Sequence, residues 1–231
     1  MMDASLEALV QRACRTEHGF RDLQQAADEL VEARTPQASA RLARDLYASQ
    51  AYQVRSVAVF VLGRLAAQED ACLVFLRRRV GQDPDWHVQE ILAKAFDRFC
   101  SDRGYELALP EIESWLSDPD PRPRRAVTEG LRIWTRRPYF CDHPEQAIQL
   151  LSRFRADADE ALRRSAGNAL RDISRSHPAL VLGELQGWDR REARVRQTYA
   201  LAARFLEHQA SDRGSDRAAP SRSSRSAGKK V

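Results

Sequence analysis

The chain has 231 residues, of which 43% are hydrophobic and 30% charged, with a formal net charge of +4 at pH 7. This length is enough for one or two domains with a buried core. No stretch approaches the roughly 18 uninterrupted apolar residues of a membrane span, and the N-terminal segment MMDASLEALVQRAC has acids and no apolar run, so neither a membrane protein nor a secretory signal is expected. The four cysteines are scattered without a C-x-x-C pair, which is typical of reduced thiols in a cytosolic protein.

Positive charge is concentrated in two parts of the chain. Residues 211–231 carry a net charge of +4 and residues 121–175 a net charge of +5. Such segregation indicates an anionic partner more strongly than the total charge does. Residues 210–231 are rich in Ser, Arg and Gly and contain no apolar run, so we expect a disordered basic tail after a folded domain at 1–209.

The folded domain is predicted to begin with two capping helices at about 5–34, followed by repeats at about 38–208. Helical segments recur at steps of 34, 35, 39 and 33 residues, and they start at Val54, Val88, Pro123, Leu162 and Val195. Positions 3, 4, 7, 8 and 11 after each start are apolar or small in four of the five copies, which is the spacing of one face of an α-helix. Trp134 takes the last of these positions in the third copy, so it is predicted to lie in the core.

Another helical candidate precedes each segment, and the turn sequences QDPD, SDPDP and ADADE separate the two members in three of the units. Asp and Pro favour turns and helix N-termini. Each unit is therefore predicted to be a helix–turn–helix that stacks on its neighbours. The pattern resembles HEAT repeats, and the consensus residues of tetratricopeptide and ankyrin repeats are absent. The predicted fold class is all-α, an α-solenoid (superhelix) of HEAT-like repeats.

Positions 2, 6 and 9 after each start share a helix face and are expected to line the concave surface of the superhelix. In the first copy they hold Ser56, Phe60 and Gly63. In the third and fourth copies, this face and the adjoining position 1 carry Arg124, Arg125, Arg132, Arg163, Arg164 and Arg171. Guanidinium groups suit phosphate, so the set favours contact with a nucleic-acid backbone. For any single arginine, an ion pair with a loop aspartate of the adjacent repeat is the commoner role, and both hypotheses stay open.

In the second copy, Trp86 stands four residues before Glu90 near the start of the predicted helix. An aromatic residue at that place commonly packs as a staple against the preceding helix, so core packing is the simpler interpretation of Trp86. Lys94 follows Glu90 by four residues and is expected to pair with it.

The segments DPDWHVQEILAKAF, PRRAVTEGLRIWTRRPYF and RRSAGNALRDISRSHPALV resemble the bacterial HEAT-repeat DNA alkylation repair proteins, the AlkC/AlkD-type alkylpurine DNA glycosylases. The resemblance spans about Gln53 to Leu206. It implies a partner, double-stranded DNA with alkylated bases, gripped by its phosphates, and a carboxylate and aromatic side chains that contact the deoxyribose and lesion.

Carried over to this chain, the resemblance makes Glu90 and Trp86 the candidate catalytic residues. The implied DNA-binding residues are Arg124, Arg125, Arg132, Arg163, Arg164, Asn168 and Arg171. Asn168 stands where AlkD-type proteins have a second aromatic residue, and the acid here is Glu where the family has Asp.

The predicted function is therefore DNA binding in alkylation repair, with hydrolysis of the N-glycosidic bond of N3- or N7-alkylated purines. An alkylated purine is already a good leaving group, so one carboxylate that stabilises the oxocarbenium-like sugar is sufficient. A strand-cutting lyase needs an amine nucleophile. Lys94 is the one lysine outside the tail, and it is expected to pair with Glu90, so a monofunctional glycosylase is expected.

The alternative is a non-catalytic HEAT-repeat scaffold that binds a protein or DNA. The histidines and cysteines show no zinc-site spacing and there is no Gly-rich phosphate loop, so neither a metal nor a cofactor is expected. A monomer in the bacterial cytosol or nucleoid, without a membrane partner, fits either hypothesis.

Overall fold

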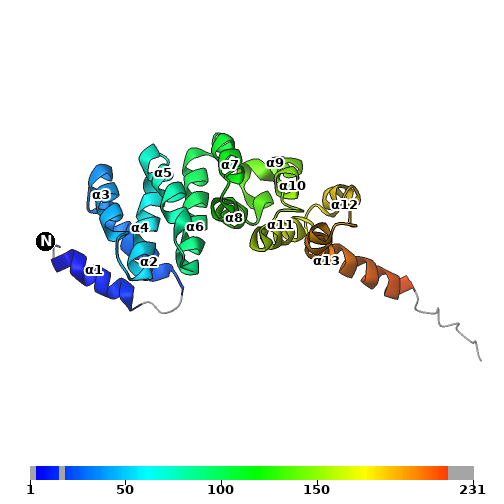
Figure 1. Cartoon of the computed structure of the whole chain (residues 1–231), viewed down its shortest axis with the longest axis horizontal. Coiled ribbons are helices and arrows are strands. Elements are labelled where there is room, and N and C mark those ends of the chain that lie inside the picture. Colours follow the sequence, from blue (N-terminus) through cyan, green and yellow to red (C-terminus); the bar gives the residue numbers. More distant parts are fainter. Residues whose placement is uncertain (1–3, 16–18, 218–231) are drawn as a thin grey trace, which may run out of the picture.

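The computed structural model describes residues 4–15 and 19–217. All regular structure within these residues is helical, with 13 α-helices and two short 3₁₀ helices. The helices of the repeats lie in two rows (Figure 1). The first helices of the five repeats are α3 (Pro36–Leu46), α5 (Asp70–Arg78), α7 (Leu109–Leu116), α10 (Pro144–Ser152) and α12 (Pro178–Gln186). The second helices are α4 (Tyr52–Leu65), α6 (Trp86–Arg103), α8 (Pro121–Gly130), α11 (Glu160–Ile173) and α13 (Ala193–Arg217). The predicted α-solenoid is confirmed.

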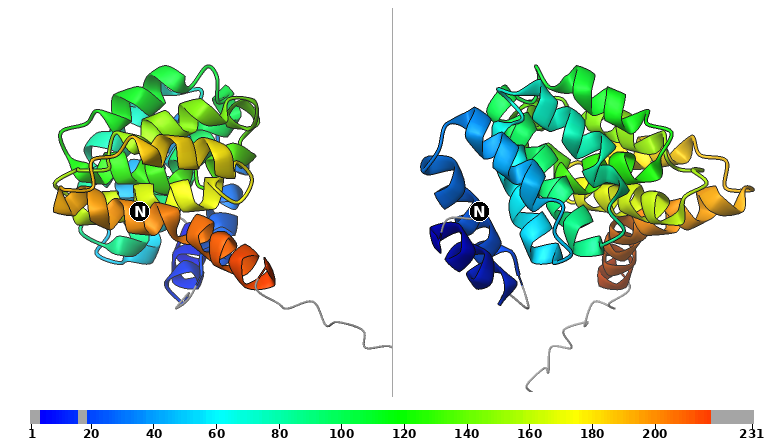
Figure 2. Two further views of the ribbon diagram at one scale, coloured as in Figure 1. Left: turned by 90° about the vertical axis from the view of Figure 1, so that its right-hand side faces the viewer. Right: turned by 60° about the vertical axis from the view of Figure 1, so that its left-hand side comes forward.

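The second helices form one continuous row, because α4 packs against α6, α6 against α8, α8 against α11, and α11 against α13. We call the exposed side of this row the second-helix face. Helix α1 (Ala4–Cys14) and the C-terminal part of α13 lie at opposite ends of the molecule and project to the same side, toward the bottom of Figures 1 and 2. No helix in the described part of the chain has the length and apolar character needed to cross a bilayer.

Aspartates of the connecting turns start three of the second helices. The side chains of Asp85, Asp120 and Asp159 accept backbone N–H groups of the first turn of α6, α8 and α11. These bonds satisfy amides that have no partner within the helix. Two residues earlier in each turn, another aspartate accepts the N–H of the capping residue, as Asp83 does for Asp85 at 2.9 Å. The Asp-rich turns therefore lie at the starts of these second helices, as predicted.

The two N-terminal helices pack on the first repeat, against its second helix α4. Helix α2 (Arg21–Glu32) packs along α4. Helix α1 also contacts α2, as the predicted N-terminal pair implies. Ser56 and Phe60 are 0% and 8% exposed, so the expectation that they line the concave surface is wrong. Ten residues of α4 are buried, because neighbouring helices cover it on nearly all sides.

The third repeat contains more structure than predicted. Helix α8 ends at Gly130, after which come the 3₁₀ helix η2 (Trp134–Arg136) and the short helix α9 (Pro138–Asp142). Trp134 is fully buried as predicted, but it lies in η2 and not on α8. Arg132 likewise follows the helix and does not belong to its face. The longer step of 39 residues to the next repeat accommodates these elements.

The C-terminal boundary also differs from the prediction. Helix α13 continues to Arg217, past the expected start of a disordered tail at residue 210. Residues 218–231, the remainder of that tail, lie outside the described residues.

Close approach of the second helices requires glycine at two junctions. A Cβ atom at Gly130 would overlap the backbone carbonyl oxygen of Ala93 on α6. A Cβ atom at Gly63 on α4 would lie 2.7 Å from the Cβ atom of Ala95. Both distances are shorter than van der Waals contact, so a larger residue would force α4, α6 and α8 apart.

We predict that Gly130→Ala lowers the free energy of unfolding by about 1–3 kcal/mol, because the added methyl group overpacks the α6–α8 junction. Urea denaturation followed by circular dichroism measures the change. Gly183→Ala in α12 is the matched control, since nothing lies within 4 Å of a Cβ atom there. The control should be neutral or raise stability by up to about 1 kcal/mol, and equal stability of the two variants would contradict the packing argument.

Candidate functional site

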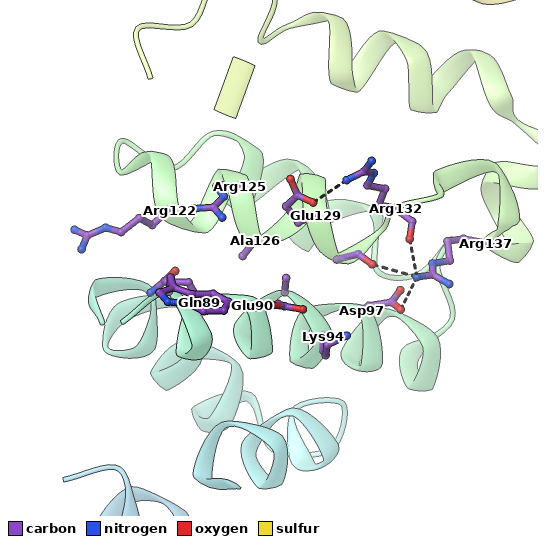
Figure 3. Close-up of a pocket in the computed structure, with 13 residues that line it drawn as sticks. Gln89, Glu90, Lys94, Asp97, Arg122, Arg125, Ala126, Glu129, Arg132 and Arg137 are labelled. Atoms are coloured by element: carbon purple, nitrogen blue, oxygen red, sulfur yellow. Dashed lines mark hydrogen bonds and ion pairs between the residues drawn. The ribbon is translucent and has the colours of Figure 1, made fainter. Parts of the chain in front are cut away.

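A cleft of about 430 Å³ opens on the second-helix face between α6 and α8 (Figure 3). Charged side chains of both signs dominate its walls. The residues that line it are Trp86, Gln89, Glu90, Ala93, Lys94, Asp97, Arg122, Arg125, Ala126, Glu129, Gly130, Arg132 and Arg137. Both candidate catalytic residues, Trp86 and Glu90, are among them.

Trp86 is the first residue of α6, and its side chain is not packed as a staple. The residue is 62% exposed, so the core interpretation of this residue is wrong. The other three tryptophans of the chain, Trp115, Trp134 and Trp188, are at most 6% exposed. Trp86 therefore presents its indole ring at one end of the cleft.

Glu90 follows Trp86 by about one helical turn on the same helix, and it is exposed. Within the described residues, its carboxylate takes part in no hydrogen bond or ion pair. The expected pair with Lys94 is not formed, since the Lys94 ammonium group lies over the ring of Phe20, 5.7 Å from its centroid. The carboxylate is thus open to a ligand in the cleft.

The far end of the cleft is closed by a bonded network around Asp97. The hydroxyl of Tyr105 donates to the Asp97 carboxylate at 2.8 Å, and Arg137 pairs with it at 2.7 Å. Burial raises the pKa of Asp97 and outweighs the opposite effects of the Tyr105 hydrogen bond and the Arg137 charge. Burial and the neighbouring carboxylate also raise the pKa of Tyr105. Asp97 is therefore a structural carboxylate, unlike Glu90.

Two of the predicted DNA-binding arginines tie adjacent repeats together. Arg124 on α8 pairs with Asp157 in the turn before α11 at 2.5 Å. Arg163 is 7% exposed and donates to the carbonyl oxygens of Asp157 and Ala158 and to the side chain of Gln197. Both arginines occupy position 1 of their repeat, where the side chain points along the row and into the turn.

Two further predicted arginines converge on one aspartate. Arg132 lies 2.8 Å and Arg171 3.4 Å from the Asp172 carboxylate. Arg132 also contacts Glu129 at 3.4 Å (Figure 3). The side chains of the two arginines are 30% and 22% exposed. Because each is paired with a carboxylate and partly shielded from water, its charge is largely compensated within the protein.

The remaining predicted residues line a second, shallower hollow of about 500 Å³ between α8 and α11. Arg125, Arg164 and Asn168 are among its lining residues, and Arg125 also borders the first cleft. Within the described residues Arg125 forms no ion pair. Arg164 has a loose contact of 3.9 Å with Glu160, in which both side chains are about two-thirds exposed. These two guanidinium groups are therefore available to an anion.

Two cationic residues of the first cleft were not predicted from the sequence. Arg122 stands at its mouth, paired with Asp120, and Arg137 closes its far end. Arg122 lies at the start of its helix, one residue ahead of the repeat positions that were compared. Arg137 comes from the inserted segment of the third repeat, and the step of 39 residues was the signal that something extra lay there. Among the described residues, no group of three or more His, Cys, Asp or Glu side chains is arranged to hold a metal ion.

Comparison with known proteins assigns the chain to a family. The sequence profile of the DNA alkylation repair enzyme family matches residues 20–203, from the start of α2 well into α13. The chain belongs to the DNA alkylation repair enzyme family. The predicted resemblance and the predicted connection to alkylation repair are thereby confirmed.

Two solved structures from Streptococcus mutans agree with this assignment to the DNA alkylation repair enzyme family. AlkD2 from Streptococcus mutans is 41% identical, with a TM-score of 0.84 over 87% of this chain and 99% of that one. The protein smu.31 from Streptococcus mutans UA159 is 40% identical, with a TM-score of 0.81 over 86% of this chain and 98% of that one. The alkylpurine DNA glycosylase AlkC of Pseudomonas fluorescens, bound to DNA containing an abasic site analog, is 22% identical with a TM-score of 0.47, over 87% of this chain and 61% of that one. No curated protein matches the chain.

The separation of structural from available arginines in this member of the DNA alkylation repair enzyme family predicts that two adjacent substitutions affect stability differently. Arg124→Ala should lower the free energy of unfolding by about 1.5–3 kcal/mol, because it removes a charge-assisted bond that is largely shielded from water. Arg125→Ala should change it by less than about 0.5 kcal/mol, since its side chain is exposed and unpaired. Chemical denaturation of both variants measures the difference. Equal losses would show that Arg125 also holds the repeats together.

Proposed function

We propose that the protein binds duplex DNA containing alkylated bases on its second-helix face and hydrolyses the N-glycosidic bond of N3- or N7-alkylated purines. Glu90 is the proposed catalytic carboxylate, and Trp86 its aromatic partner. The protein acts as a monomer on DNA of the bacterial cytosol or nucleoid. The observation that carries the proposal is the Glu90 carboxylate, open and unpaired in the cleft about one helical turn from an exposed indole.

The chemistry requires little more than these two groups. In an alkylated purine nucleotide the base carries a positive charge, and it leaves as a neutral molecule with the electrons of the bond to C1′. The sugar that remains has oxocarbenium character, which a nearby carboxylate stabilises. Glu90 then accepts a proton from the water that attacks C1′. The face of Trp86 attracts the cationic base or sugar through its ring quadrupole.

The arginines that stay free in the fold supply the grip on the DNA backbone. Arg125 and Arg164 lie on consecutive second helices and line the shared hollow next to the cleft. Guanidinium groups bind phosphate through paired N–H donors. Arg132, which lines the cleft, and Arg171 both share their charges with Asp172, so their proposed contribution to phosphate binding is weaker.

The proposed enzyme is monofunctional, since strand cutting would need an amine that forms a Schiff base with the sugar. The Lys94 ammonium group is held over the Phe20 ring. It is therefore directed toward α2 and not to Glu90.

A second candidate function is DNA binding without base excision. Trp86 is the single aromatic residue among the side chains that line the two hollows, both within the described part of the chain. Asn168, at the place where AlkD-type proteins have another aromatic residue, lies in the second hollow and offers an amide instead. With this lining, a lesion could stack on the Trp86 ring alone.

Release of alkylated base from methylated duplex DNA separates the two candidates. We expect the wild type to release 3-methyladenine or 7-methylguanine, and Glu90→Gln to release it at least about a hundredfold more slowly, because the neutral amide does not stabilise the developing positive charge. Glu145→Gln on α10 is the control for loss of a carboxylate and should retain wild-type rates. Absence of release by the wild type, with DNA binding intact, would establish the non-catalytic candidate.

The salt dependence of DNA affinity tests the grip independently of catalysis. Replacing both Arg125 and Arg164 by Ala should reduce the slope of log affinity against log salt concentration by about 1.8, since each lost phosphate contact removes about 0.9. The control is Arg41→Ala with Arg78→Ala, which removes two exposed arginines of the first-helix row and should leave the slope unchanged. Fluorescence anisotropy with a labelled duplex measures both. An unchanged slope in the first double variant would exclude this face as the DNA site.

A further inference from the structure

Three aromatic rings form a stack across the junction of α4 and α6, next to the cleft. The imidazole of His87 lies between the indole of Trp86, with ring centroids 3.6 Å apart, and the phenol of Tyr52, with centroids 4.2 Å apart. The ring planes are inclined by 28° and 18° respectively, so both contacts are face to face. His87 thus covers one face of the exposed indole.

The stack joins equivalent positions of neighbouring repeats. Tyr52 and Trp86 each stand two residues before the start of their repeat segment and are each the first residue of a second helix. The position of His87 in the other repeats holds Gln53, Arg122, Ala161 and Arg194. None of those is aromatic, so the sequence permits a three-ring stack of this kind at one junction, beside the cleft that contains Glu90.

His87 itself is held in place from the helix start. Asp85 accepts both the backbone N–H of His87 and its ring nitrogen Nδ1, each at 2.9 Å. A carboxylate is an acceptor, so Nδ1 carries the hydrogen in this arrangement. Burial would raise the pKa of Asp85, but the His87 bonds, together with the nearby charge of Arg55, hold it below its usual range. The charged groups around the imidazole are therefore Asp85 and, behind it, Arg55, 3.9 Å from that carboxylate.

Trp86 has little else to fix it. Its residue is 62% exposed, and no hydrogen bond of its indole nitrogen occurs within the described residues. A free indole at a helix start samples several rotamers, and ordering it on ligand binding costs conformational entropy. Stacking on a ring that is itself anchored removes part of that cost before the ligand arrives.

We propose that His87 is a positioning residue, which holds the Trp86 indole beside Glu90 by stacking while Asp85 anchors the imidazole. The link to DNA affinity rests on the proposed function, whereas the effect on the indole does not. The stacked ring carries the effect, and the backbone N–H bond to Asp85 and the Tyr52 ring still hold an aromatic replacement in place, so such a replacement keeps the effect. A polar replacement that retains only a donor to Asp85 loses it.

The first test is quenching of tryptophan fluorescence by acrylamide, which needs no DNA. Trp86 dominates the quenched emission because the other three tryptophans are buried, and Trp86→Phe gives the background. His87→Asn should increase the quenching constant, since both faces of the indole become accessible. His87→Phe should keep the wild-type constant, with His87→Tyr as a second ring-retaining variant. A wild-type constant in His87→Asn, or equal increases in all three variants, would overturn the proposal.

The second test is affinity for methylated duplex DNA, measured on the same variants after their folding has been checked by circular dichroism. His87→Asn should bind about two- to tenfold more weakly, because the indole must be ordered on binding, and His87→Phe should restore the wild-type affinity. Weakening in both variants to the same degree would contradict positioning by the ring. If the wild type does not bind DNA, the proposed function fails, and the quenching result still decides whether His87 positions Trp86.

Discussion

The alignment of the second helices depends on one ion pair that recurs along the row. An arginine near the start of one second helix bonds to an aspartate in the turn before the second helix of the next repeat. Arg55 on α4 bonds to Asp83, and Arg124 on α8 to Asp157. A rigid row results, because each turn aspartate also caps the backbone of its own turn. Side chains on consecutive helices thereby face the same way, and the second-helix face depends on this alignment.

The same bond is absent where the main cleft opens. At the corresponding position of α6 stands Gln89, which bonds back to its own turn, and Arg77 from the first-helix row takes the bond to Asp118 instead. Glycine then brings α6 and α8 into close contact at the other end of the junction, where Gly130 meets Ala93. At the cleft, the two repeats are therefore tied together from the first-helix row, and the close contact of Gly130 with Ala93 forms part of the cleft's own lining.

The sequence predicted the repeating part of the molecule well, because a helical period and capping aspartates are local signals. It could not predict that Phe60 on α4 is buried, because a helix face that meets a ligand and one that meets another helix can carry the same apolar and small residues. It also could not separate Arg124 from Arg125, which are adjacent in sequence and differ in the direction of the side chain relative to the next turn. Trp86 is the reverse case, where an apolar residue stays exposed against its preference for the core.

The inserted segment of the third repeat, residues 132–142, lies outside the repeating bonds that align the row. It nevertheless supplies Arg137, which closes the far end of the cleft against Asp97. The same segment buries Trp134 and Phe140 in the core, and its Arg132 pairs with Asp172 on α11. The far end of the cleft is therefore built by a stretch that is also part of the core, so a change there would alter the shape of the cleft and the packing of the third repeat together.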